Sequence, residues 1–322
     1  MVRKAKKIVS VTRILLLFLL MIAIAVLVGK YNITPVAQHL LAQYSDHKTT
    51  PVPPLKPEPD HYAPISAGKL KSRNAILLRL TDHAILMTKN SKERIYPASL
   101  TKMMTAIVAI ENLPDLKEQI KLTNSTFQGL RETDASMAGF LPGEQVRVID
   151  LLYGVMLPSG AECCIGLADQ IAGSEHDFVK MMNQKAADLG MKDTHFENAT
   201  GLHNSNHYTT VKDLAILLSY ALQNDTFRDI FTSSHYSTPP TNKHPGGITF
   251  YNTMFAGLRS QNIAGGEILG GKTGYTDEAG LCLASLARVG KQEYILITAG
   301  AEGNHQSVQY NIIDALAVYN SL

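Results

Sequence analysis

Strand-like apolar runs occur near both ends of the folded part of this sequence. Residues 75–80 and 84–88 are two such runs on either side of a short polar turn, a pattern typical of a β-hairpin. Towards the C-terminus, runs separated by Gly-containing turns predict three further strands, at 268–274, 281–287 and 294–299.

The middle of the chain has helical periodicity instead. Apolar residues at this spacing predict helices at 99–112, at 150–156, after Pro158 and at 211–223, with a last helix at about 305–320. Strands at both ends around a helical middle predict an α+β fold. We expect one antiparallel sheet built from both ends of the chain, with flanking helices packed on it.

The first 30 residues form a separate segment. Residues 14–29 are an uninterrupted apolar run that would span roughly 24 Å as a helix. Basic residues lie almost entirely before this run, which places the N-terminus inside the cytoplasm and the body outside. We expect a single-pass membrane anchor. A cleaved signal peptide is the alternative, because residues 23–25 resemble a cleavage site, although the apolar run continues beyond them.

Residues 31–60 are predicted to be a linker, since the prolines between 51 and 59 favour an extended, semi-rigid chain. Residues 61–322 are then one folded domain. Their composition is that of a globular protein: 45% of the whole chain is hydrophobic and 18% is charged. Six of the 30 basic residues lie in 1–30, which leaves 24 basic and 28 acidic residues elsewhere. A body with this balance does not have the charge of a nucleic-acid-binding protein.

Three cysteines and two histidines are candidates for a disulfide or a metal site. Cys163 and Cys164 are adjacent, and Cys282 lies far along the chain. We expect small buried apolar residues, with a disulfide between Cys282 and one of the pair as the alternative. His203 and His207 lie in a polar stretch and are expected to be surface histidines rather than metal ligands. No metal or cofactor is predicted.

Three short clusters carry the chemistry. The first contains Ser99 and Lys102, preceded by Pro97, which suits the start of a helix. Three-residue spacing places both side chains on one face, and Ser99 at the positive helix end. Apolar neighbours predict a partly desolvated Lys102 amine with a lowered pKa, as a general base requires. A helix-capping serine and a surface lysine are the alternative for this motif alone.

The second and third clusters supply the remaining polar groups. Ser159 lies in a Pro-Ser-Gly turn between two predicted helices, where it either presents its hydroxyl to a cleft or caps a helix. Lys272, Thr273, Gly274 and their neighbours form a Gly-rich strand end that lets a substrate backbone approach closely. The ammonium group of Lys272 suits a carboxylate. Together the clusters predict acyl transfer by a serine that a lysine activates.

These clusters resemble those of the low-molecular-mass penicillin-binding D-alanyl-D-alanine carboxypeptidases, peptidase family S11, which are relatives of the serine β-lactamases. The resemblance covers about residues 62–322. It rests on four stretches: Tyr96–Thr105, Phe140–Glu144, Asn198–Leu202 and Lys272–Gly280. It implies a DD-peptidase/β-lactamase-like fold and removal of the terminal D-alanine from peptidoglycan stem peptides through an acyl-enzyme. It also implies inhibition by β-lactams.

The resemblance implies a role for each matching residue. Ser99 would be the acylated nucleophile, Lys102 its base and Ser159 the proton relay. Lys272 and Thr273 would hold the terminal carboxylate, with Thr276 as a further contact. Gly274 would belong to the same substrate-binding stretch, and the backbone N–H groups of Ser99 and Tyr275 would form the oxyanion hole.

One position departs from the family pattern. The family usually has asparagine where this chain has Ala161. Losing one such contact costs on the order of 1–3 kcal/mol, or one to two decades in rate.

Two alternatives therefore stay open besides the carboxypeptidase. One is a β-lactamase or DD-endopeptidase, although Glu197 and Asn198 are adjacent rather than spaced as a class A β-lactamase requires. The other is a non-catalytic cell-wall-binding protein.

Overall fold

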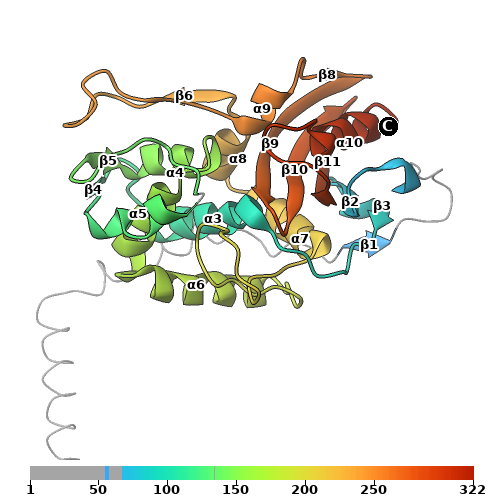
Figure 1. Ribbon diagram of the computed structural model, residues 1–322. Helices are drawn as coiled ribbons and strands as arrows, with labels where there is room; N and C mark the ends of the chain where they lie inside the picture. The colour runs from blue at the N-terminus through green and yellow to red at the C-terminus, as the bar shows by residue number, and fades with distance from the viewer. Residues whose placement is uncertain (1–54, 58–66, 134) are drawn as a thin grey trace, which may run out of the picture. The chain divides into compact units, whose positions relative to one another are not determined.

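The computed structural model describes residues 55–57, 67–133 and 135–322. Strands from both ends of this region form one seven-stranded sheet in the order β1-β3-β2-β11-β10-β9-β8 (Figure 1). Their bounds are β1 (Lys56–Pro57), β2 (Asn74–Arg79), β3 (Ala84–Lys89), β8 (Asn262–Ile263), β9 (Gly266–Thr276), β10 (Gly280–Val289) and β11 (Gln292–Ala301). The central pairing joins β2 to β11, antiparallel. The predicted sheet is confirmed.

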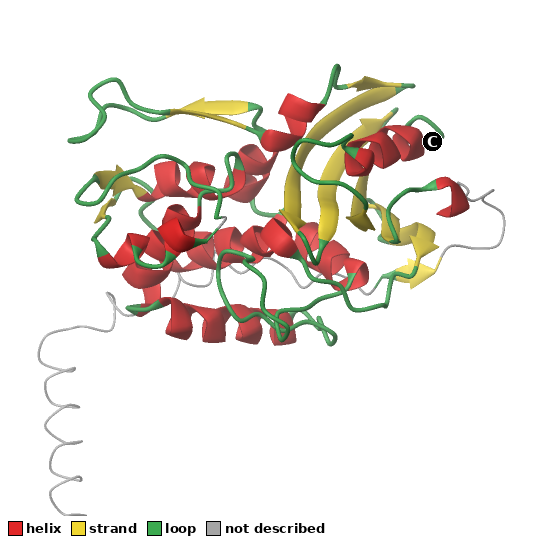
Figure 2. Ribbon diagram, viewed as in Figure 1, coloured by secondary structure: helices red, strands yellow, loops and turns green. Residues whose placement is uncertain are grey.

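Alternating side chains on the strands divide the core into two layers. On β11, Ile295 and Ile297 face the larger helical layer, whereas Leu296 faces the opposite side of the sheet. The first face is covered by α7 (Val211–Ala221) and α8 (Asp225–Thr232), and beyond them lie α3 (Lys102–Asn112), α4 (Val148–Met156), α5 (Ala161–Ala172) and α6 (Glu175–Asp188). The second is covered by α9 (Thr253–Gly257) and α10 (Tyr310–Tyr319). Figure 2 shows the helical region beside the sheet.

Several elements differ from the sequence prediction. Helices α6 and α8 and the small sheets β4–β5 (Gln119–Lys121, Gln145–Arg147) and β6–β7 (His235–Ser237, Thr249–Tyr251) were not predicted. The last helix begins at Tyr310 rather than 305, because Asn304 accepts backbone hydrogen bonds that form a separate turn. Part of the predicted linker pairs in the sheet as β1, where the Lys56 N–H donates to the His83 carbonyl.

The predicted anchor at 1–30 lies outside the described residues. Among the residues that are described, no helix is both long and apolar enough to cross a membrane. All three cysteines are buried free thiols, so the expectation of buried apolar residues is confirmed and the disulfide alternative is wrong.

Gly154 sets the close approach of α4 to α5. A Cβ atom at this position would lie 2.5 Å from the Cys163 sulfur. We expect Gly154→Ala to lower the free energy of unfolding, because overpacking costs about 1–3 kcal/mol and outweighs the roughly 1 kcal/mol that alanine gains in a helix. Denaturant unfolding measures this. Adding Cys163→Ala should restore part of the loss, and a single variant as stable as the parent would contradict the expectation.

Candidate active site

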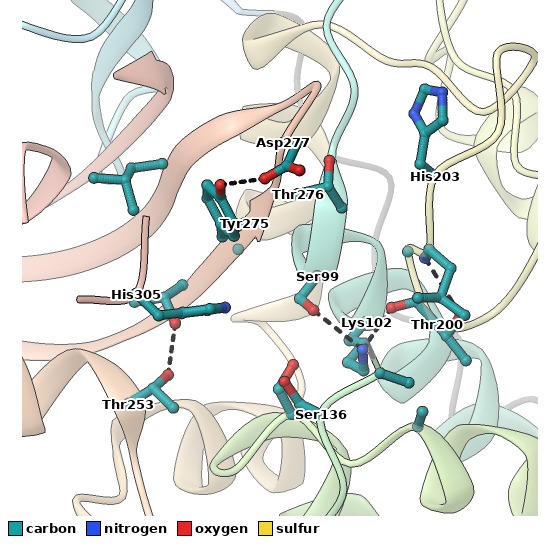
Figure 3. A pocket seen from close by; sticks show the side chains of 18 of the residues that line it. Ser99, Lys102, Ser136, Thr200, His203, Thr253, Tyr275, Thr276, Asp277 and His305 are labelled. Carbon is teal, nitrogen blue, oxygen red and sulfur yellow. Dashed lines mark hydrogen bonds between the residues drawn. The ribbon is translucent and has the colours of Figure 1, made fainter. Parts of the chain in front are cut away.

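Ser99 and Lys102 meet at the start of α3. Ser99 lies in a 3-10 turn, η2 (Ala98–Thr101), and α3 begins at Lys102, so the predicted helix over 99–112 starts with this tighter turn. Lys102 Nζ donates to Ser99 Oγ at 3.1 Å and also to the Thr200 carbonyl. Lys102 is only 2% exposed, whereas Ser99 is half-buried and faces the pocket (Figure 3). The two side chains are therefore paired as the spacing predicted.

The turn that presents Ser99 is held in an unusual backbone conformation. Ala98 has a φ of 47°, in the left-handed region that residues with a side chain rarely adopt. Gly201 packs against this turn, and a Cβ atom on it would lie 2.0 Å from the Ala98 carbonyl oxygen. The Asn198 side chain fixes the Gly201 loop by accepting from two backbone N–H groups, those of Thr200 and Gly201. The loop thereby supports both the Ser99 turn and the carbonyl that binds Lys102.

Ser159 and Lys272 form a second pair. Ser159 lies in the turn between α4 and α5 with a φ of 68°, and it is buried. Lys272 Nζ donates to Ser159 Oγ at 3.0 Å and to the Thr273 carbonyl at 2.9 Å. The predicted relay hydroxyl is thus bonded to Lys272 of β9 rather than to Lys102. The helix-cap alternative does not describe Ser159, because Gly160 is the N-cap residue of α5.

Burial lowers the pKa of both lysines. For Lys102 the loss of water outweighs the opposing effect of Cys164, Glu162 and Cys163. For Lys272, which is fully buried, the loss of water is again the main cause, and the charge of Lys102 lowers its pKa further. Two ammonium groups so placed repel each other, so the neutral form of one is favoured whenever the other is protonated.

Alternate residues of β9 direct their backbone N–H and C=O groups towards the pocket. The Gly271 carbonyl accepts from the Asn252 side chain and the Thr273 carbonyl accepts from Lys272, so both point away from β10. A strand residue directs its N–H and C=O to the same edge. Tyr275, two residues on, therefore directs its N–H towards the pocket. A Cβ atom at Gly274 would lie 3.0 Å from the Ser99 nitrogen, which brings the two predicted oxyanion-hole residues together.

These groups line one cavity of about 900 Å³ between β9 and the helical region. Several lining residues were not singled out in the sequence: Ser136, Thr200, Thr253 and His305. Thr253 shares a 2.6 Å hydrogen bond with Thr273. Thr276 accepts from the Ala279 N–H and so also shapes the turn after β9. Residues such as Thr253 carry no local signal, because only the fold brings α9 next to β9.

The residue at position 161 is an apolar alanine, whereas its neighbour, Glu162, carries a carboxyl group. Ala161 is 1% exposed at the first position of α5. Glu162 does not take the place of an asparagine amide at the lysines. Its Oε1 instead accepts the N–H groups of Ala138, Gly139 and Phe140, at 2.7, 2.8 and 3.3 Å. Burial raises the pKa of Glu162, while these three donors oppose that rise.

The two histidines have different environments. His203 is partly exposed at the pocket, 3.6 Å from Glu278. His207 is 2% exposed, so the expectation of a surface residue is wrong for it. It shares a 2.8 Å hydrogen bond with Thr101, and burial lowers its pKa to about 4. In the described part of the chain no group of three His, Cys, Asp or Glu residues could hold a metal ion.

Gly201→Ala tests the support of the nucleophile turn. A methyl group at a φ of 80° and 2.0 Å from the Ala98 carbonyl must displace either the turn or the loop. The resemblance implies that Ser99 is acylated by penicillin, and we expect this labelling to slow by at least about tenfold, a change of about 1.4 kcal/mol in the barrier. Gly190→Ala is the control, since Gly190 also has a positive φ but no atom within 4 Å of the added methyl group. Equal labelling rates in both variants would contradict the expectation.

Comparison with known proteins places this geometry in a family. Peptidase family S11, described as D-alanyl-D-alanine carboxypeptidase, matches residues 61–303. D-alanyl-D-alanine carboxypeptidase DacF of Bacillus subtilis is 36% identical over 237 residues, 72% of this chain and 58% of that protein. DacC of Escherichia coli is 33% identical over 74% of this chain and 58% of its own length. The chain thus spans a little over half the length of these relatives.

Solved structures agree with the sequence match. The crystal structure of the Streptomyces K15 DD-transpeptidase superposes with a TM-score of 0.71 at 27% identity, covering 80% of this chain and 98% of that one. The D-alanyl-D-alanine carboxypeptidase from Mycobacterium tuberculosis has the same fold, with a TM-score of 0.69. The predicted DD-peptidase/β-lactamase-like fold is confirmed. The chain belongs to peptidase family S11, the D-alanyl-D-alanine carboxypeptidases.

Proposed function

We propose that this protein is a penicillin-sensitive serine carboxypeptidase that removes the terminal D-alanine from peptidoglycan stem peptides. The hydrogen bond between Lys102 Nζ and Ser99 Oγ carries the proposal, because it pairs a desolvated amine with a hydroxyl at the edge of a pocket. The family membership and the carboxypeptidase names of its relatives support the same reaction.

Acylation follows from the positions of these groups. Neutral Lys102 accepts the Ser99 proton as Oγ bonds to the carbonyl carbon of the penultimate D-alanine. The carbonyl oxygen becomes negative and is stabilised by the N–H groups of Ser99 and Tyr275. The C–N bond then breaks, and the amine of the leaving D-alanine receives the proton from Lys102, with Ser159 as the relay. Water finally hydrolyses the ester, releasing the shortened peptide and restoring Ser99.

The substrate carboxylate also determines which of the two lysines is protonated. It would lie beside Lys272 and Thr273, where the negative charge favours the protonated form of Lys272. Repulsion from that charge favours the neutral form of Lys102, the form that acts as a base. Substrate binding thus prepares the nucleophile. The Thr253–Thr273 hydrogen bond orients the Thr273 hydroxyl for the same carboxylate.

The other candidate functions have less support. A class A β-lactamase needs a glutamate that activates water, but Glu197 shares a 3.0 Å hydrogen bond with His195 and is absent from the described lining of the pocket. A non-catalytic wall-binding protein would have no need for a buried lysine at its serine, yet the Ser99–Lys102 pair is intact. We therefore propose the carboxypeptidase alone.

We also propose where the enzyme acts. Residues 1–30 would hold it in the cell membrane or direct its export, and residues 31–60 would connect this segment to the catalytic domain at 61–322. The domain would then be extracytoplasmic, where its peptidoglycan substrate and β-lactam inhibitors are accessible.

Intact-mass measurement after penicillin treatment tests the proposed nucleophile. We expect one covalent adduct of the full penicillin mass on the wild type and none on Ser99→Ala, since Ser99 is the proposed nucleophile that opens the lactam ring. The same pair is assayed for D-alanine release from a D-Ala-D-Ala peptide. A wild type that forms no adduct and releases no D-alanine would refute the proposed function.

The pH dependence of acylation tests the base. An ordinary lysine has a pKa near 10.5, and burial lowers that of Lys102. Acylation requires the neutral amine, so kcat/KM should rise with pH and reach its plateau below pH 10.5. Lys102→Arg keeps the positive charge but cannot lose its proton in this range, and it should abolish acylation. A rise in kcat/KM centred at the ordinary lysine pKa near 10.5, or an active Lys102→Arg variant, would be inconsistent with this role.

A further inference from the structure

The wall of the pocket opposite β9 lacks a polar side chain at position 161. Ala161 lines the cavity but offers only a methyl group. Ser159, two residues earlier, has its hydroxyl engaged by Lys272. A peptide lying along the edge of β9 is hydrogen-bonded on one side by that strand. Its other side faces this wall, and polar atoms buried there without a partner weaken binding.

Ser136 offers a hydroxyl at this wall. Figure 3 shows its side chain directed into the pocket on the side of Ser99 and Lys102. The residue is exposed, and in the part of the chain that the structure describes its hydroxyl is not hydrogen-bonded to another protein group. A serine hydroxyl both donates and accepts, so it can pair with either an N–H or a carbonyl of a bound peptide.

The segment that carries Ser136 is fixed to the turn around position 161. The Ala161 N–H donates to the Ser136 carbonyl at 2.8 Å. Glu162 holds the segment that follows, by accepting from the N–H groups of Ala138, Gly139 and Phe140. Contact is also tight at Gly160, where a Cβ atom would lie 2.9 Å from the Ala138 nitrogen. Ser136 is therefore held at a set position beside the nucleophile rather than on a loose loop.

We propose that Ser136 is a substrate-binding residue of the active site. Its hydroxyl hydrogen-bonds the backbone of the acyl-donor peptide from the wall opposite β9, and so supplies the polar contact that Ala161 cannot make. This inference rests on the proposed carboxypeptidase function and adds a residue to it. The hydrogen bond is made to the substrate itself, and it becomes stronger as the bound peptide approaches Ser99.

A double-mutant cycle between positions 136 and 161 tests the proposal. D-alanine release and penicillin acylation are measured for Ser136→Ala, Ser136→Thr, Ala161→Asn and the double variant S136A/A161N. We expect Ser136→Ala to lower kcat/KM about tenfold, as the loss of one hydrogen bond to a bound peptide does. Ser136→Thr, which keeps a hydroxyl, should stay within about threefold of the wild type. With asparagine at 161 the loss from Ser136→Ala should shrink to about twofold.

Controls separate this contact from a structural effect. Ser125→Ala removes an exposed hydroxyl outside the lining of the pocket and should leave both rates unchanged. The melting temperature of every variant is recorded, and Ser136→Ala should melt with the wild type. Ser136→Ala rates within twofold of the wild type, or equal losses with alanine and asparagine at 161, would overturn the role of Ser136 while the carboxypeptidase stands. A wild type that neither releases D-alanine nor binds penicillin covalently would overturn both.

Discussion

Two lysine amines are buried in one pocket, and the cost of placing them there shapes the whole active site. Taking an ammonium group out of water is costly, and two of them also repel. Their hydrogen-bond partners are hydroxyl and carbonyl oxygens: Ser99 and Thr200 for Lys102, and Ser159 and Thr273 for Lys272. Neutral acceptors stabilise a proton less than a carboxylate would. The site therefore favours at least one neutral amine, which is what a serine nucleophile requires.

Strain is concentrated next to these amines. Ala98 and Ser159 both have a positive φ, and each such residue costs of order 1–3 kcal/mol when it is not glycine. Both are held by close packing: Gly201 lies against the Ala98 carbonyl, and the Ser159 turn is closed by the Gly160 N–H donating to Gly154. The glycines near the site thus have the same structural role. They allow backbone to approach where a side chain would push the nucleophile or relay out of position.

The helical middle of the chain does more than cover the sheet. It supplies the wall of the pocket opposite β9, where the α4–α5 turn and the segment before Phe140 are locked together by Glu162. Glu162, next to Ala161, would replace the missing asparagine only if its carboxylate bonded the lysines or the substrate. The structure instead bonds Glu162 Oε1 to three backbone N–H groups of residues 138–140, because a glutamate in the first turn of α5 reaches the adjacent loop. The polar contact near Ala161 is then left to another residue of the same wall.

The class of fold, the sheet shared between both chain ends and the Ser99–Lys102 pair could all be predicted from the order of amino acids. These follow from local signals: apolar runs bounded by turns for the strands, and a three-residue spacing at the start of a helix. Local pattern missed α6, whose exposed face leaves few apolar positions to detect, and it placed His207 on the surface.

Packing of distant segments sets which amine bonds which hydroxyl. It pairs Ser159 with Lys272 and brings Ser136 and Thr253 into the pocket. These contacts join residues up to 113 positions apart in sequence. Their geometry depends on how β9 packs against the helical region, and no local pattern of residues encodes that packing.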